Sequence, residues 1–108
     1  MIRHLTPAEL AAWRADVARQ APVLVDVREA WEFSRCRIEG SLHVPLATLG
    51  ARLSELPTNR DLVLVCHHGG RSEHAAVMLE RSGFANVHNL RGGVEAWAIE
   101  VDPSIGRY

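Results

Sequence analysis

The sequence has no segment able to cross a membrane. Its 108 residues contain no apolar run near the roughly 18 residues of a membrane-spanning helix. The N-terminal segment MIRHLTPAELAAW also has no unbroken apolar stretch of the roughly 7–15 residues that a signal peptide needs. We therefore expect a cytoplasmic protein with no membrane partner.

Cysteine is scarce and neither sign of charge is in excess. Cys36 and Cys66 are too few for the disulfide framework of a secreted domain, which leaves both available as thiols. The 12 basic and 13 acidic side chains give a formal net charge of −1 and form no block of one sign, so the sequence indicates no nucleic-acid partner. There is no internal repeat or linker, and residues 1–108 are expected to form one domain.

The first helix is marked by its start signal. Residues Thr6-Pro7-Ala8-Glu9 have the form of a capping box with proline at the first helical position. Leu10, Trp13 and Val17 follow at positions i, i+3 and i+7, which places them on one face of a helix. The pattern predicts a helix whose stripe of three apolar side chains is buried.

Short apolar segments alternate with helical patterns through the rest of the chain. Three segments are predicted strands: VLVDV (residues 23–27), LVLVC (62–66) and the short segment Asn86–Leu90. The first two are apolar without polar alternation, which is typical of strands covered on both faces. Three groups at helical spacing predict helices: Leu46, Leu49, Leu53 and Leu56, ended by Pro57; Ala75, Met78 and Leu79, closed by a left-handed Gly83; and Val94, Trp97 and Val101, ended by Pro103. This order predicts an α/β fold, a central parallel sheet flanked by helices on both faces, with residues 101–108 as a surface segment.

The most informative segment is VCHHGGRS, residues 65–72, in which a cysteine at the end of a strand meets the start of a helix. Open α/β folds bind their ligands at this edge of the sheet. Gly69 and Gly70 allow consecutive backbone N–H groups to curl toward the sulfur, and Arg71 and the helix N-terminus add positive charge. The loop therefore favours the thiolate form of Cys66, and it can also bind an anionic group that the thiolate acquires.

Two other interpretations of the loop remain open at this level. A cysteine after a buried strand is often an inert small apolar residue, although inert packing requires neither the glycines nor the arginine. Cysteine and histidine are also zinc ligands, but Cys66, His67 and His68 are contiguous and have no second ligand pair at zinc-site spacing. We expect no metal.

Four segments, in order, resemble the single-domain rhodanese-like sulfurtransferases. They are VLVDVREAWEF, RIEGSLHVPL, VCHHGGRS and LRGGVEAW, and together they span nearly the whole chain. The resemblance implies the rhodanese fold and an enzyme that carries sulfane sulfur as a persulfide on Cys66. The donor it implies is thiosulfate or a related molecule, the acceptor is cyanide or a small or protein thiol, and no cofactor is needed.

The resemblance also assigns roles to residues near Cys66. His67, His68, Gly69 and Gly70 would form a backbone cradle for the substrate, with Ser72 in the first turn of the helix beside it. Arg71 would orient the loop or attract an anionic donor. Asp26 and Arg28 match an Asp-x-Arg pair with a structural role near the site, and Gly92 and Gly93 would form a turn close to the loop.

Two alternative functions compete with sulfur transfer. Rhodanese-fold phosphatases and arsenate reductases also bracket an anion with Cys and Arg, but their loops are one residue longer than the four residues between Cys66 and Arg71. A non-catalytic binding module is the second alternative, and such modules commonly lack the cysteine.

Other residues are interpreted without a direct role in the chemistry. We interpret Cys36 as a bystander, and we expect three aromatic residues to form core or pocket wall, namely Trp31, Phe33 and Trp97. The remaining histidines are expected at surface or hydrogen-bonded positions, namely His4, His43, His74 and His88.

Overall fold

A five-stranded parallel sheet forms the centre of the computed structural model, which describes residues 1–108. In spatial order the strands are β1 (Arg3–Leu5), β5 (Val87–Leu90), β4 (Leu62–Val65), β2 (Val23–Asp26) and β3 (Leu42–His43). The α-helices are α1 (Pro7–Ala15), α2 (Ala30–Arg35), α3 (Leu46–Leu49), α4 (Gly70–Arg81) and α5 (Gly93–Glu100), with 3₁₀ turns η1 (Gly50–Glu55) and η2 (Pro103–Ile105).

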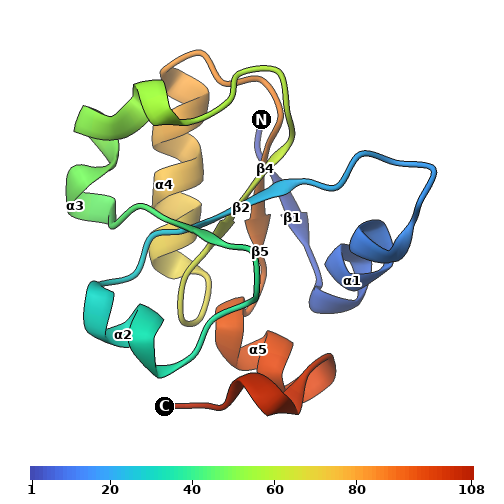
Figure 1. Ribbon diagram of the computed structural model, residues 1–108. Helices are drawn as coiled ribbons and strands as arrows, with labels where there is room; N and C mark the ends of the chain where they lie inside the picture. The colour runs from blue at the N-terminus through green and yellow to red at the C-terminus, as the bar shows by residue number, and fades with distance from the viewer.

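Helices cover both faces of this sheet, as the sequence predicts. Alternate residues of the buried strand β4 point to opposite faces, so the two faces have separate cores. Leu64 packs in one cluster with Leu79 of α4, whereas Val63 packs in the other with Leu10 of α1 and Trp97 of α5. Figure 1 shows α3 and α4 together on one side of the sheet and α1 on the other.

Local signals fix several helix ends where they were expected. The Thr6 hydroxyl accepts a hydrogen bond from the Glu9 backbone N–H at 3.1 Å, and the Glu9 carboxylate accepts one from the Thr6 N–H at 2.8 Å. The predicted capping box at the start of α1 is therefore confirmed. Gly83 follows α4 with φ of +100°, the left-handed conformation predicted for the end of that helix.

Two predicted apolar stripes do not form as expected. Helix α1 ends at Ala15, because Asp16 adopts an extended conformation and accepts a hydrogen bond from the Ala18 N–H, so Val17 lies outside the helix and is fully exposed. The segment with leucines at 46, 49, 53 and 56 is not one α-helix but α3 followed by η1, with non-helical dihedrals at Arg52. Gly50, a poor helix former, stands at the junction.

Three short elements carry no signal that the sequence analysis detected. They are β1, β3 and α2, which have three, two and six residues. Segments this short do not show a clear period, and their positions are set by pairing with the longer strands and by contacts around the site. No helix of the fold has the length and apolar character needed to span a bilayer.

The parallel strands bring three predicted segments to one edge of the sheet. β2, β4 and β5 pair in register and end at Asp26, Val65 and Leu90. The residues after these ends include Arg28, the Cys66 loop and the glycine pair at 92 and 93. The carboxyl edge of the sheet therefore gathers the segments from which a site can be built.

Candidate active site

The loop after β4 encloses the sulfur of Cys66. The Cys66 residue is 1% exposed, and its Sγ accepts a hydrogen bond from the Gly69 backbone N–H at 3.0 Å. The Ser72 hydroxyl, in the first turn of α4, lies 3.3 Å from the same sulfur. Gly69 has φ of +109°, so the tight return of the chain toward the sulfur uses a conformation that favours glycine. The structure thus places one backbone donor on Sγ and one hydroxyl within reach of it.

The remaining amides of the loop have no acceptor within the protein. The chain between Cys66 and the second turn of α4 carries five such backbone N–H groups, those of His67, His68, Gly70, Arg71 and Ser72. Unpaired amides at a helix N-terminus, with its positive dipole end, form an anion-binding site. An anionic atom added to the sulfur would therefore meet donors that are still free.

Helix α5 fixes the back of this loop. The Val94 N–H donates to the Cys66 carbonyl at 2.9 Å, and the Glu95 N–H donates to the His67 carbonyl at 3.2 Å. Gly93 is packed so closely that a Cβ added to it would lie 2.3 Å from the Cys66 carbonyl oxygen. The glycine turn predicted near the loop is thus in contact with it, and it leaves no space for a side chain.

Arg71 is held by a residue that the sequence analysis missed. Its two terminal nitrogens donate to the two carboxylate oxygens of Glu32, on α2, at 2.7 and 2.8 Å. The hydrogen bonds from Arg71 hold the pKa of Glu32 at about 2, far below its ordinary value, against the opposing effect of burial. The same pairing raises the pKa of Arg71. Arg71 is therefore a cation held in a fixed position next to the loop.

Asp26 and Arg28 form a fully buried ion pair beneath the site. The Arg28 Nε and Nη2 donate to the two Asp26 carboxylate oxygens at 3.0 and 2.7 Å, and both side chains are 0% exposed. The other Arg28 hydrogens reach the carbonyl oxygens of Glu32 and Cys36 and the hydroxyl of Tyr108. Burial would lower the pKa of Arg28, but the bonds to Asp26 and Tyr108 raise it. The pair joins β2 to α2 and to the last residues of the chain.

The tail lies at the surface, as expected, but its last residue packs against the loop. The Tyr108 ring stacks on the ring of His67, with centroids 4.0 Å apart, and His67 stacks in turn on His68 at 3.9 Å. The Tyr108 hydroxyl donates to Glu32 at 3.1 Å. Burial, followed by the charge of His68, lowers the pKa of His67, whose Nε2 is buried without a partner. An amphipathic ring with a hydroxyl tip is suited to this position between apolar and polar groups.

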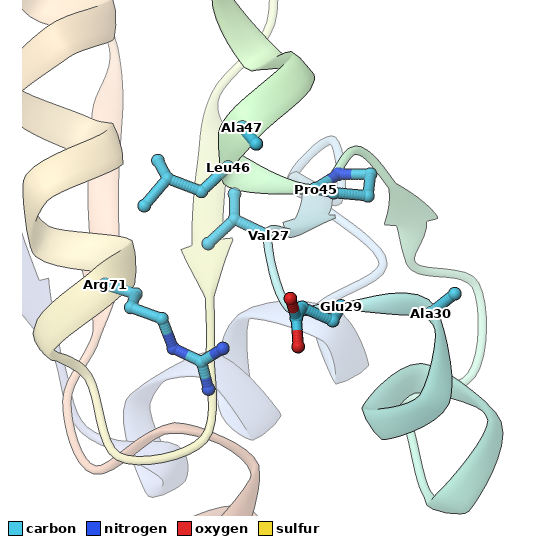
Figure 2. A pocket seen from close by; sticks show the side chains of 7 residues that line it. All are labelled: Val27, Glu29, Ala30, Pro45, Leu46, Ala47 and Arg71. Atoms are coloured by element: carbon cyan, nitrogen blue, oxygen red, sulfur yellow. The ribbon is translucent and has the colours of Figure 1, made fainter.

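A pocket of about 530 Å³ opens next to Arg71 at the same edge of the sheet. Figure 2 shows the Arg71 guanidinium, from α4, and the Glu29 carboxylate, at the start of α2, facing the space between these elements. Val27, Pro45 and Leu46 form an apolar wall above them. The pocket combines an apolar surface with one group of each charge, and it adjoins the cation of the loop.

The remaining histidines mostly occupy structural or surface positions, as predicted. His43 Nε2 lies 2.7 Å from the Arg28 carbonyl oxygen, and His88, which is buried, lies 3.0 Å from an Asp61 carboxylate oxygen. His74 is exposed on α4. No three His, Cys, Asp or Glu side chains gather in the way that a metal site requires.

The aromatic predictions are partly wrong. Trp97 is buried and Phe33 is half-buried, but Trp31 is 56% exposed and belongs to no core. Its indole N–H donates to Glu29 instead. Cys36 and Cys66 are both free and pack in different core clusters, which fits the interpretation of Cys36 as a bystander.

Comparison with known proteins places the chain in a family. Residues 6–100 match the model of the rhodanese-like domain. A rhodanese-like domain protein from Staphylococcus aureus superposes with a TM-score of 0.85 over 99% of each chain, at 25% identity. The chain belongs to the rhodanese-like family, and its parallel sheet with helices on both faces is the fold of that family.

Curated relatives indicate the general activity. The chain is 36% identical over 98 residues to a sulfurtransferase of Allochromatium vinosum, covering 91% of this chain and 90% of that protein. It is 34% identical over 95 residues to the thiosulfate sulfurtransferase GlpE of Pseudomonas savastanoi, covering 88% and 86%. One longer sulfurtransferase relative is matched over only 26% of its length. These relatives support an enzyme that transfers sulfur.

We predict that Gly93→Ala destabilises the protein by about 2–4 kcal/mol, because the new Cβ would overlap the Cys66 carbonyl and Gly93 has φ of +59°. Denaturant unfolding measures the change. Gly50→Ala is the matched control, since Gly50 has helical dihedrals and open space around it, and it should be neutral or slightly stabilising. Equal stability of the wild type and Gly93→Ala would contradict this view of the loop.

We predict that Glu32→Gln lowers the free energy of unfolding at neutral pH by roughly 2 kcal/mol, less than the pKa of Glu32 alone implies, because Arg71 is 39% exposed. A carboxyl with a depressed pKa stabilises the fold above its ordinary value of 4.5. The difference between wild type and variant should therefore disappear as the pH falls from 4.5 toward 2.

Unfolding curves over this pH range provide the test. Glu55→Gln, which breaks an exposed pair with Arg52, is the control and should have a much smaller effect. A Glu32→Gln difference that stayed constant down to low pH would refute the assignment of the ion pair as its cause.

Proposed function

We propose that this protein is a thiosulfate sulfurtransferase that carries sulfane sulfur as a persulfide on Cys66. The Cys66 thiolate attacks the outer sulfur of thiosulfate, the S–S bond of the donor breaks, and sulfite leaves with the bonding pair. Cyanide or a thiolate then attacks the outer sulfur of the persulfide and restores the Cys66 thiolate, with thiocyanate or a new persulfide as product. This is covalent catalysis in two half-reactions.

The observation that carries the proposal is the set of free amides around a cysteine whose sulfur accepts the Gly69 N–H and lies within reach of the Ser72 hydroxyl. A persulfide at neutral pH bears its negative charge on the outer sulfur, one bond beyond Sγ. Preorganised N–H groups stabilise such a charge without reorganising. Five amides without a protein acceptor suit an added anionic sulfur better than a neutral thiol alone.

Arg71 is assigned an electrostatic and positioning role rather than direct binding of the transferred sulfur. Glu32 engages both terminal nitrogens of Arg71, which keeps the guanidinium at the rim of the loop. From there its charge attracts an anionic donor such as thiosulfate. In this proposal Asp26 and Arg28 support the site by holding α2, which carries Glu32.

The same geometry disfavours a phosphatase or arsenate reductase. Those reactions need an arginine that binds the oxygens of a tetrahedral anion, and here the paired edge of Arg71 is occupied by Glu32. The loop also has only four residues between Cys66 and Arg71. A binding module without activity is disfavoured by the presence of the cysteine and its donors.

We assign the acceptor to the class of thiols, with cyanide as a laboratory substitute. The pocket beside Arg71 has an apolar wall and room for a small thiol or for a protein segment that carries one. We also assign the protein to the cytoplasm, because two free buried thiols suit a reducing compartment.

Intact mass spectrometry tests the proposal. Incubation with thiosulfate should add the mass of one sulfur atom, and cyanide should then remove it with formation of thiocyanate. Cys66→Ala should gain nothing, whereas Cys36→Ala, which removes the other cysteine, should still gain one sulfur. A sulfur gain that survives in Cys66→Ala would contradict the assignment. Phosphate release from an aryl phosphate that depends on Cys66 would favour the phosphatase alternative.

A further inference from the structure

The Ser72 hydroxyl has one proton and three acceptors within reach. Its Oγ lies 3.3 Å from Cys66 Sγ, 3.2 Å from the Gly69 carbonyl oxygen and 2.5 Å from the side-chain oxygen of Asn89. Ser72 is 0% exposed and Asn89 is 3% exposed, so bulk water does not donate to the acceptors that the single Ser72 proton leaves unpaired. Whether the sulfur receives the Ser72 proton therefore depends on what Asn89 presents to the hydroxyl.

Asn89 is held in turn by a histidine on the neighbouring strand. The parallel register of β1 and β5 aligns His4 with Asn89, and the His4 Nδ1 lies 3.3 Å from the Asn89 side-chain nitrogen. The other His4 nitrogen, Nε2, lies 3.7 Å from a Glu73 carboxylate oxygen on α4. A continuous chain of side chains thus runs from the partly exposed His4 through Asn89 and Ser72 to the sulfur.

This chain has two self-consistent directions. In the first, Ser72 donates to the Asn89 oxygen and the Asn89 NH₂ donates to His4 Nδ1, so the sulfur receives no proton from Ser72. In the second, the His4 Nδ1–H donates to the Asn89 oxygen, the Asn89 NH₂ donates to Ser72, and the Ser72 hydroxyl donates to sulfur. An amide side chain can turn either end toward Ser72 with little change in shape. Only the second direction stabilises an anionic sulfur.

We propose that His4 and Asn89 are positioning residues that direct the Ser72 hydroxyl onto the Cys66 sulfur when that sulfur is anionic. In the second direction His4 Nδ1 is the donor to Asn89, while the other ring nitrogen, Nε2, faces the Glu73 carboxylate at 3.7 Å. The inference rests on the proposed function and deepens it, because Cys66 Sγ is a thiolate at the start of the first half-reaction and again at the end of the second.

A thermodynamic cycle on the Cys66 thiolate tests this hydrogen-bond chain without a sulfur donor. The quantity measured is the thiolate-to-thiol ratio of Cys66 at neutral pH. It is obtained from ultraviolet thiolate absorbance after subtraction of the absorbance of the same protein carrying Cys66→Ala. His4→Ala and Asn89→Ala should each lower the ratio about threefold to tenfold, the loss of one weak charge-assisted hydrogen bond. In a Ser72→Ala background the same changes should have almost no further effect, since their common target is gone.

His74→Ala is the matched control, because His74 is an exposed histidine on α4 without a role in the chain, and its ratio should equal that of the wild type. His4 has a side chain that is 33% exposed, so His4→Ala should fold even if the buried Asn89→Ala does not. The proposal is overturned if His4→Ala leaves the ratio unchanged, or lowers it equally with and without Ser72. Because no donor is used, this result stands apart from any failure of sulfur transfer.

Discussion

The buried ion pair between Asp26 and Arg28 is the interaction on which the architecture of the site depends. Both side chains are fully excluded from solvent, and charges in that situation persist only if they are paired and hydrogen-bonded. Removing one partner of such a pair typically costs about 3–5 kcal/mol. Arg28 meets this requirement by binding Asp26 and by donating to two carbonyl oxygens at α2 and its end. These hydrogen bonds from Arg28 fix the position of α2, the helix that carries Glu32.

The other residues of the site are positioned by contacts that extend from this ion pair. Glu32 fixes Arg71 at the rim of the loop, and the Tyr108 hydroxyl links Arg28 to Glu32. On the opposite side, α5 holds the carbonyls of the Cys66 loop and leaves its amides free. In the loop the carbonyls of Cys66, His67 and Gly69 accept backbone hydrogen bonds while most of the amides remain available, which favours binding of an anion. The sulfur chemistry that we propose for Cys66 depends on this difference between paired carbonyls and free amides rather than on any single charged side chain.

The features predicted from the sequence are those that local chemistry determines. The Thr6 capping box, the buried strands and the left-handed Gly83 each depend on residues close together in the chain, and each is present. The loop at 65–72 could be recognised because its cysteine, glycines and arginine lie close together in the sequence, within residues 66–71.

What the sequence did not reveal depends on contacts between distant segments. Glu32 and Arg71 are separated by 39 residues, and Glu32 and Tyr108 by 76, so no local pattern indicates either pairing. Glu32 has the appearance of an ordinary first-turn acidic residue of a short helix. The predicted stripe at Val17 failed for a related reason, since the helix end at Asp16 is set by a local turn that periodicity ignores.

The most direct test of the account is a high-resolution crystal structure of the protein after exposure to thiosulfate. We predict density for one additional sulfur bonded to Cys66 Sγ, within hydrogen-bond distance of several of the five free amides of residues 67, 68 and 70–72. The loop backbone should keep its present course, because the donors are already in place. An added sulfur that pointed away from these amides, or one found on Cys36, would contradict the central claim.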